Sequence, residues 1–336
     1  MRKLQAVLLL VGVAALSWLV WRLGPRTLLD GLAKIGWGFV LTCLAHQNGL
    51  MLDSVILRIF AGAPGRNVPY LHYLRTSMSG HAINEATPLG KLGEVTKFTM
   101  LSERLPKKRA AATLVAQNIC SFVVNCGLIG LGAPIALIIF EVRGPMAVAF
   151  GLVSGAFFIA GVVGLVILQR GVGRLPFFLL RAGVGRFRLS RARIERWRKE
   201  WHSIEEIWQE ASRDSAAMQT AWVCAICSRL SDVGETALIL YFLGADHILP
   251  AAVLSLGTSQ AISWTLFFVP LQAGSAEGGA YIVFQAVGLS PATGVLVEIG
   301  RKLRRVVFIT LGVSLLGWDT FAQFRRKPEQ PPESAR

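Results

Sequence analysis

Charged residues are scarce in this chain, and their scarcity excludes an ordinary soluble domain. They make up 16% of the 336 residues, whereas hydrophobic residues make up 53% and the mean hydropathy is +0.51. A soluble globular domain has about 25% charged residues. Several apolar runs reach the roughly 20 residues with which a helix crosses about 30 Å of hydrocarbon. The composition therefore predicts an all-α integral membrane protein.

Cysteines and catalytic motifs are also lacking. The five cysteines all lie in apolar runs, and an odd number at such positions does not indicate a disulfide framework. Cys224 and Cys227 form a CxxC, but without a second pair or a nearby histidine they are interpreted as packing residues. The chain has no GxSxG, HExxH, P-loop or nucleotide fingerprint. We therefore predict no metal, no cofactor and no enzymatic activity.

Acidic residues are few, so the net charge is +15. The basic residues cluster between apolar runs, which favours the positive-inside rule over nucleic-acid binding. They are concentrated in residues 103–109, in residues 170–213 with eleven Lys or Arg, and in the tail. These segments predict the cytoplasmic side, together with both termini, although Arg22, Arg26 and Lys34 fall on the other side and oppose this orientation.

The apolar runs predict about six transmembrane helices, at residues 4–21, 37–60, 110–140, 146–169, 216–243 and 291–318. The first has no clear cleavage site and is expected to remain as a helix. We predict a single membrane domain over residues 1–324, with repeat halves at 37–169 and 216–318. Residues 325–336 are predicted to be a disordered cytoplasmic tail.

Two further apolar segments, residues 68–101 and 248–289, are interrupted in the middle by Pro, Gly and charged residues. The interruptions contain PLGKLGE at 88–94 and PLQAGSAE at 270–277. Each half has about a dozen residues, too few to cross the bilayer. We therefore predict two re-entrant helical hairpins. Because three spans separate them, they are expected to enter from opposite faces as an inverted repeat, an arrangement typical of transporters.

Residues 170–215 have the pattern of an amphipathic cytoplasmic helix. Ile194, Trp197, Trp201, Ile204 and Trp208 recur at steps of three and four. This helix is expected either to lie on an anionic membrane surface or to pack across the cytoplasmic side of the protein.

Ionisable side chains near the first interruption are candidates for function. Lys91 and Lys97 are expected to hold a phosphate near the start of a half-helix at Gly93. The alternative is that Glu94 and Lys97 form a local ion pair that stabilises the hairpin. Asn84 approaches the same tip and is a further candidate for substrate contact.

The last two predicted spans also carry charges. Arg301 and Arg305, four residues apart on one face, are expected either to line a cavity with Glu298 and Glu277 as counter-charges or to extend to the outer interface. Asp232 and Glu235 are expected to carry coupled protons, or to form salt bridges with Arg229 and the last-span arginines. His46 and Asn48, in the second span, are predicted to form hydrogen bonds between helices.

Residues 81–104, HAINEATPLGKLGEVTKFTMLSER, and residues 269–305 resemble the two signature segments of a known family. It is the flippase-like membrane domain of lysylphosphatidylglycerol synthases and of stand-alone relatives, including hopanoid-associated proteins. The resemblance covers nearly the whole chain, although Lys91 and Lys97 stand where the first motif commonly has Arg, and residues 272–275 differ from the more Gly-rich second motif. Because the chain ends at Arg336, without room for the aminoacyl-transferase domain, the resemblance implies lipid translocation without aminoacylation.

The sequence thus predicts a lipid transporter of the bacterial inner membrane that works by alternating access. Its expected ligand is a phospholipid or polyprenyl phosphate with an anionic or modified headgroup, and the candidate contacts are Asn84, Lys91, Glu94, Lys97, Gln272, Glu277, Arg301 and Arg305. Two alternatives remain open. One is a membrane-embedded enzyme or enzyme module with Glu94 and Glu277 as an acid/base pair, and the other is a non-transporting partner of a lipid-modifying enzyme.

Overall fold

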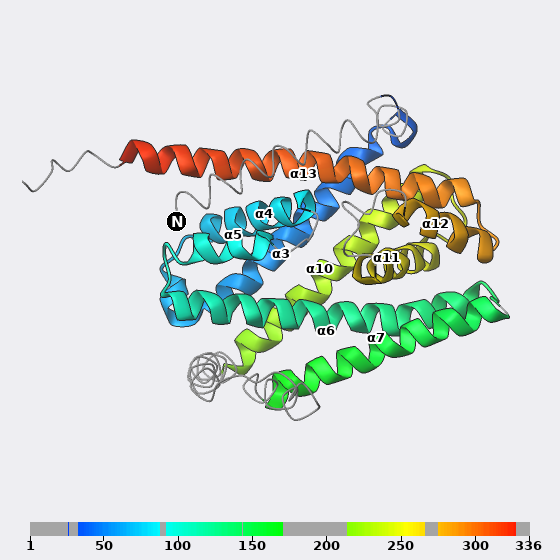
Figure 1. Ribbon diagram of the computed structural model, residues 1–336, viewed down its shortest axis with the longest axis horizontal. Helices are drawn as coiled ribbons and strands as arrows, with labels where there is room; N and C mark the ends of the chain where they lie inside the picture. Colours follow the sequence, from blue (N-terminus) through cyan, green and yellow to red (C-terminus); the bar gives the residue numbers. More distant parts are fainter. Residues whose placement is uncertain are drawn as a thin grey trace, which may run out of the picture.

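The protein is all-helical over the residues that its computed structural model describes, which are 26, 33–87, 92–142, 144–170, 214–265 and 275–326. With the labels of Figure 1, the helices are α3 (Gly38–Arg66), α4 (Tyr70–Ala86), α5 (Leu92–Leu101), α6 (Lys107–Ile139), α7 (Pro145–Arg170), α10 (Ser215–Phe242), α11 (Ile248–Thr265), α12 (Ser275–Ala286) and α13 (Pro291–Arg326). The predicted span at 4–21 and nearly all of the amphipathic segment at 170–215 lie outside the described residues.

Within the described part of the chain, three helical segments are long and apolar enough to cross a membrane. They are Gly38–Arg66 in α3, Lys107–Ile139 in α6 and Ala147–Val166 in α7. Helix α10 coincides with the predicted span at 216–243 to within one residue at each end, and α13 contains the span at 291–318 and continues beyond it, but charged side chains lower the hydropathy of both helices. The prediction of an all-α membrane protein is therefore confirmed. Helix α13 continues to Arg326, so the first two residues of the predicted tail are helical.

The two interrupted segments each form a pair of short helices. Helices α4 and α5 have 17 and 10 residues, and α11 and α12 have 18 and 12 residues. At 1.5 Å per residue, even α11 is only about 27 Å long, slightly less than the hydrocarbon thickness. The members of each pair lie side by side in Figure 1. The residues that connect them, 88–91 and 266–274, lie outside the described part of the chain.

The helix pairs lie at opposite ends of the bundle, between α13 on one side and α6 with α7 on the other (Figure 1). Helices α3 and α10 cross the middle and pack against each other. One apolar core joins α10 to the second pair and α13 through Leu240, Ala252, Phe284 and Val297. Another joins α3 to the first pair and α6, and it includes Leu57, Tyr73, Leu101 and Ala110. Polar side chains lie between these two cores, near the centre of the bundle.

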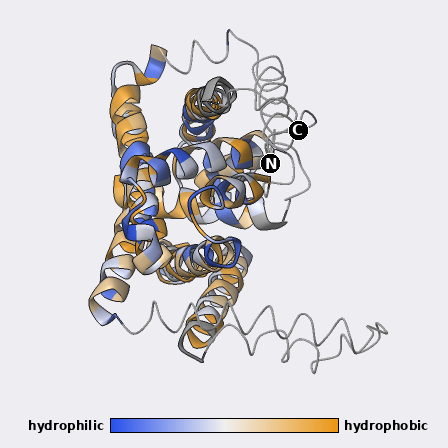
Figure 2. Ribbon diagram, turned by 90° about the vertical axis from the view of Figure 1, so that its left-hand side faces the viewer, coloured by the Kyte–Doolittle hydropathy of each residue, from blue (hydrophilic) through white to orange (hydrophobic). Residues whose placement is uncertain are grey.

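Large apolar side chains cover the outside of α6 and α7. The exposed ones include Leu131, Ile135, Ile138, Val148, Leu152, Ile159 and Val162. Figure 2 shows the same distribution, with orange residues dominating the outer helices and blue residues gathered toward the middle. An apolar exterior around a polar interior is expected where lipid replaces water as the surrounding solvent.

The first helix pair depends on a close backbone approach at Gly93. Its N–H donates to Asn84 Oδ1 at 2.8 Å, and a Cβ added to Gly93 would overlap the Gly80 carbonyl oxygen. We expect Gly93→Ala to lower the free energy of unfolding by about 1–3 kcal/mol, because the helices must separate. Thermal unfolding in detergent would measure this. Gly127→Ala in α6 is the control, since a Cβ there meets nothing within 4 Å; equal melting temperatures for the two variants would contradict the prediction.

Candidate functional site

A cavity of about 170 Å³ lies among α3, α4, α10, α11 and α13. Its walls carry four carboxylates, four arginines and two histidines: Asp53, Glu85, Asp232, Glu235, Arg229, Arg301, Arg304, Arg305, His46 and His81. Ionisable side chains inside a membrane domain are costly and are usually paired or line a polar path. This concentration of charge makes the cavity the candidate functional site.

Two arginines of α13 are paired with carboxylates on different helices. Arg304 Nε lies 2.9 Å from Glu235 Oε1 of α10, in an ion pair whose angle does not meet the geometry of a hydrogen bond. Arg305 Nε lies 2.7 Å from Glu85 Oε2 of α4. Arg304 and Arg305, which are consecutive residues of α13, thus connect α13 to α10 and to α4.

Arg229 of α10 is shared by two carboxylates. It lies 2.8 Å from Asp232 Oδ2 on its own helix and 3.5 Å from Asp53 Oδ2 on α3. Asp53 also accepts a hydrogen bond from Ser228 at 2.9 Å. The predicted alternative of a salt bridge between Asp232 and Arg229 is therefore present in the structure.

Arg301 is the centre of a buried polar cluster. Its guanidinium donates to Glu298 Oε1 at 2.7 Å, to Ser259 Oγ at 2.8 Å and to Thr236 Oγ1 at 2.8 Å. Ser259 in turn donates to Glu298 at 2.5 Å. These bonds connect α10, α11 and α13, and they place Glu298 as the fixed counter-charge of Arg301.

Arg301, for which both the cavity and the outer interface were expected positions, is buried in the structure, and so is its neighbour Arg304. They are 5% and 7% exposed and belong to the cavity wall. The same run contains Lys302, which is 2% exposed and pairs with Glu277 of α12. The basic run of α13 is therefore distributed between the cavity and the second helix pair.

Two histidines connect the carboxylates of the cavity. His46 Nδ1 lies 3.3 Å from Glu235 Oε2, and its Nε2 lies 3.2 Å from His81 Nε2. His81 Nε2 lies 3.9 Å from Glu85 Oε1. The predicted contacts between helices are confirmed for His46, and also for Asn48, which donates to Ser231 Oγ at 2.8 Å.

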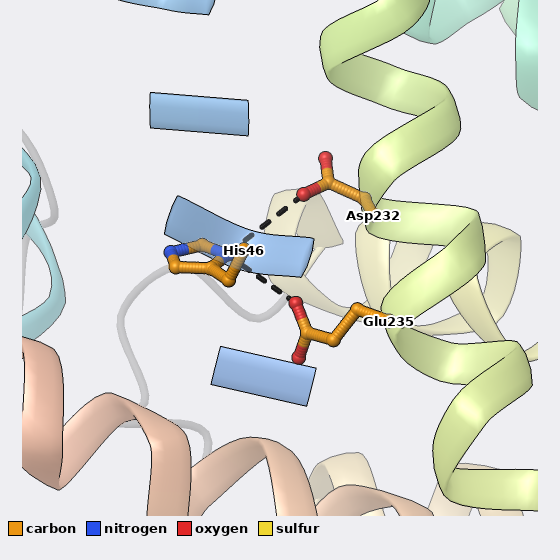
Figure 3. A group of neighbouring side chains, drawn as sticks. All are labelled: His46, Asp232 and Glu235. Carbon is orange, nitrogen blue, oxygen red and sulfur yellow. Dashed lines mark ion pairs between the residues drawn. The ribbon is translucent and has the colours of Figure 1, made fainter. Parts of the chain in front are cut away.

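The atoms of His46, Asp232 and Glu235 also have the spacing of a cation site. In Figure 3, both carboxylates of α10 point toward the imidazole on α3, and one donor atom from each residue lies within 4.8 Å of the others. However, Arg304 Nη1 contacts the same imidazole, 2.7 Å from its Nε2, and the guanidinium is paired with Glu235. We interpret the three residues as part of an ion-pair network in which Arg304 supplies the positive charge.

The predicted residues of the first helix pair form a separate cluster. Glu94 accepts hydrogen bonds from Lys97 Nζ at 3.0 Å, Asn84 Nδ2 at 3.2 Å and Asn118 Nδ2 at 2.9 Å. The stem of Lys97 packs over Gly80. None of these residues is among those that line the cavity. The geometry matches the alternative in which Glu94 and Lys97 stabilise the hairpin.

The other sequence candidates are divided between the clusters. Arg301, Arg305, Asp232 and Glu235 meet at the cavity, whereas Glu277 does not line it. Lys91 and Gln272 lie outside the described residues. Glu85, His81 and Arg304, which also line the cavity, are not among the site residues predicted from the sequence. The four-residue spacing of His81 and Glu85 was the available signal, since it places them on one face of a helix.

Comparison with protein families gives a match over most of the chain. The family model described as the lysylphosphatidylglycerol synthase TM region matches residues 5–312. The comparisons with curated proteins and with solved structures found no match. The matched range contains the cavity and both helix pairs, so the family relationship extends to the whole candidate site.

Proposed function

Because the chain belongs to the family of the lysylphosphatidylglycerol synthase transmembrane region, we propose that it is a lipid transporter. It moves a phospholipid or polyprenyl-phosphate-type lipid with an anionic or modified headgroup across the inner membrane. The observation that carries this proposal is the charged cavity among five helices of a membrane domain.

The cavity meets the main physical requirement of lipid translocation, which is a polar path for the headgroup. An ion placed bare in an apolar medium costs tens of kcal/mol. Arginine binds phosphate through parallel N–H groups, and Arg301, Arg304 and Arg305 all face the cavity. Its volume of about 170 Å³ is well above the roughly 15 Å³ that one water molecule needs. The acyl chains would stay in the surrounding lipid.

The helix pairs fit the architecture of an alternating-access transporter. We propose that α4–α5 and α11–α12 are re-entrant hairpins that enter from opposite faces, with both termini in the cytoplasm. Interrupted helices next to a central polar site occur in transporters built from inverted repeats. The cavity takes His81 and Glu85 from one pair and Ser259 and Gln260 from the other, so relative movement of the pairs would change access to it.

An enzyme that uses Glu94 and Glu277 as an acid/base pair has less support. Glu94 is held by Asn84, Lys97 and Asn118, while Glu277 is paired with Lys302. An acid and a base that act on one substrate must both reach it. Neither residue lines the described cavity, which favours transport over catalysis.

A blocked cavity provides the test of transport. The full chain is reconstituted in phosphatidylcholine vesicles that contain a trace of NBD-labelled phosphatidylglycerol, and dithionite is added outside. We expect the protein to expose nearly all of the label, whereas protein-free vesicles protect the inner half. Gln260→Trp in α11, which fills the cavity, should reduce the rate at least tenfold.

Gln285→Trp in α12 is the matched control, because Gln285 is exposed on the same helix pair. It should transport the labelled lipid at the rate of the unmodified protein. Wild-type vesicles that protect the label as protein-free vesicles do would refute the proposed function. Equal rates for both tryptophan variants would show that lipid does not pass through this cavity.

A further inference from the structure

Four titratable side chains lie one after another along the wall of the cavity and are called the proton chain below. The proton chain runs from Glu235 on α10 to His46 on α3, and then to His81 and Glu85 on α4. The successive atoms are 3.3, 3.2 and 3.9 Å apart. His46 faces Glu235 through Nδ1 and His81 through Nε2, and an imidazole can take a proton at one nitrogen and release it from the other. His81 presents the same nitrogen, Nε2, to both His46 and Glu85, so the four side chains can hold a proton at either carboxylate without a direct relay through His81.

Each end of this chain also holds an arginine of α13. Glu235 pairs with Arg304, and Glu85 pairs with Arg305. A carboxylate that accepts a proton becomes neutral and loses most of its attraction for the guanidinium. The position of one proton thus determines which of two consecutive arginines is available to another anion.

The charges of the cavity explain why a proton is required. Counted with Glu298, the partner of Arg301, the four arginines face five carboxylates, so the cluster carries one excess negative charge when both histidines are neutral. A bound phosphate would add a second negative charge in the same small volume, where like charges repel strongly. Uptake of one proton restores the charge of the free site and frees an arginine at the same time.

Among the described residues, the ionisable groups around the proton chain do not provide another carboxylate whose protonation would free an arginine. Those that act on it are Arg229 and Asp232 on α10, Lys97 on α5 and Arg301 on α13, and Asp53 on α3 lines the same cavity. Asp53 and Asp232 share Arg229, so a proton on one of them leaves that arginine paired with the other. Arg301 keeps Glu298 as its own partner. Among the residues that the structure describes, Arg304 and Arg305 are the arginines paired with the two ends of the proton chain.

We propose that the proton is a co-substrate of this site, taken up by the chain Glu235–His46–His81–Glu85 as one anionic headgroup binds. The inference rests on the proposed transport function. The proton adds from water to a carboxylate oxygen and forms a neutral carboxyl group, and the released arginine binds the phosphate oxygens. When the lipid leaves, the carboxyl group returns the proton to water and the ion pair forms again.

Calorimetry can count the protons directly. The full-length protein in dodecyl maltoside is titrated with dihexanoyl-phosphatidylglycerol in two buffers that differ in ionisation enthalpy. We expect about one proton to be taken up for each lipid bound. With that coupling, Kd should rise about tenfold per pH unit. The rise is expected at pH values above those at which the proton chain of the lipid-free protein is already protonated.

Glutamine variants test whether Glu85 and Glu235 take up the proton. Glu85→Gln removes one negative charge, so the phosphate can replace it without a proton, and both the uptake and the pH dependence of Kd should disappear. Glu235→Gln should behave in the same way and serves if Glu85→Gln does not fold. Glu103→Gln, at an exposed position between α5 and α6, is the matched control and should keep the wild-type proton count.

The outcomes separate this inference from the proposed function. Wild-type protein that transports NBD-phosphatidylglycerol but binds dihexanoyl-phosphatidylglycerol without proton uptake would overturn the co-substrate role alone. Proton uptake that persists in both glutamine variants would overturn the assignment to this chain. Protein that neither binds nor transports the lipid would refute both proposals.

Discussion

Arg301→Met is expected to lower the free energy of unfolding by about 3–5 kcal/mol, the largest stability effect that we predict for one side chain. Arg301 is 6% and Glu298 is 2% exposed at the side chain, and their atoms lie 2.7 Å apart. Removing the guanidinium leaves Glu298 buried without its charged partner. It also removes the donor for the hydroxyl groups of Thr236 and Ser259.

A double variant distinguishes the cost of the unpaired charge from the loss of packing. Arg301→Met combined with Glu298→Leu removes both charges and should recover most of the stability, because buried ion pairs are often replaceable by apolar residues of similar volume. Denaturation in detergent, followed by tryptophan fluorescence, would measure each variant. Arg104→Met, at an exposed position in the loop after α5, is the control and should change stability by less than about 1 kcal/mol.

The result also separates stability from transport. The double variant should fold but move NBD-phosphatidylglycerol poorly, because the cavity has lost one of the arginines proposed to bind phosphate. If the double variant were as unstable as Arg301→Met alone, the destabilisation would come from lost packing and hydrogen bonds, and the ion-pair explanation would fail.

The helices of this protein could be predicted from the sequence because lipid imposes simple rules. Apolar length decides which segments can cross, and it identified α3, α6 and α7. Interruption by Pro, Gly and charge identified the α4–α5 and α11–α12 pairs, since neither half is long enough to cross alone. Both rules use only neighbouring residues, so no tertiary information was needed.

The pairing of charges could not be predicted in the same way. Arg305 meets Glu85, and Arg304 meets Glu235, across helices that are far apart in the sequence. Such partners depend on how α13 crosses α4 and α10, and no local pattern records this. The depth of the α13 arginines in the membrane was also ambiguous from the sequence. The 36 residues of α13 extend about 54 Å, well beyond the hydrocarbon thickness. Position along that helix therefore does not give position in the membrane.

The local pair of Glu94 and Lys97 was recognisable from its spacing, whereas its extra partners were not. Asn84 comes from α4 and Asn118 from α6, so Glu94 joins three helices at the first pair. A spacing of three residues is compatible with both a structural pair and a phosphate site. The contacts from neighbouring helices favour the structural role, and that role has a measurable consequence.

Glu94→Ala is expected to lower the free energy of unfolding by about 3 kcal/mol, at the lower end of the range for a broken buried pair. The Glu94 side chain is 29% exposed, so water compensates part of the loss, but Lys97 is 11% exposed and would keep an unpaired ammonium group. The donors of Asn84 and Asn118 would also lose their acceptor. Glu94→Gln with Lys97→Met removes both charges and should recover most of the stability in the same denaturation experiment.

Lipid affinity then decides whether Lys97 has a second role. In Glu94→Gln, the ammonium group loses its charged partner, so a Lys97 that binds headgroups would hold dihexanoyl-phosphatidylglycerol more tightly than in the wild type. We expect reduced stability with unchanged Kd, because Lys97 packs over Gly80 and does not line the cavity. A tighter Kd in Glu94→Gln that is lost again with Lys97→Met would instead place the headgroup at the first helix pair. It would then follow that lipid contacts residues beyond the arginines of α13.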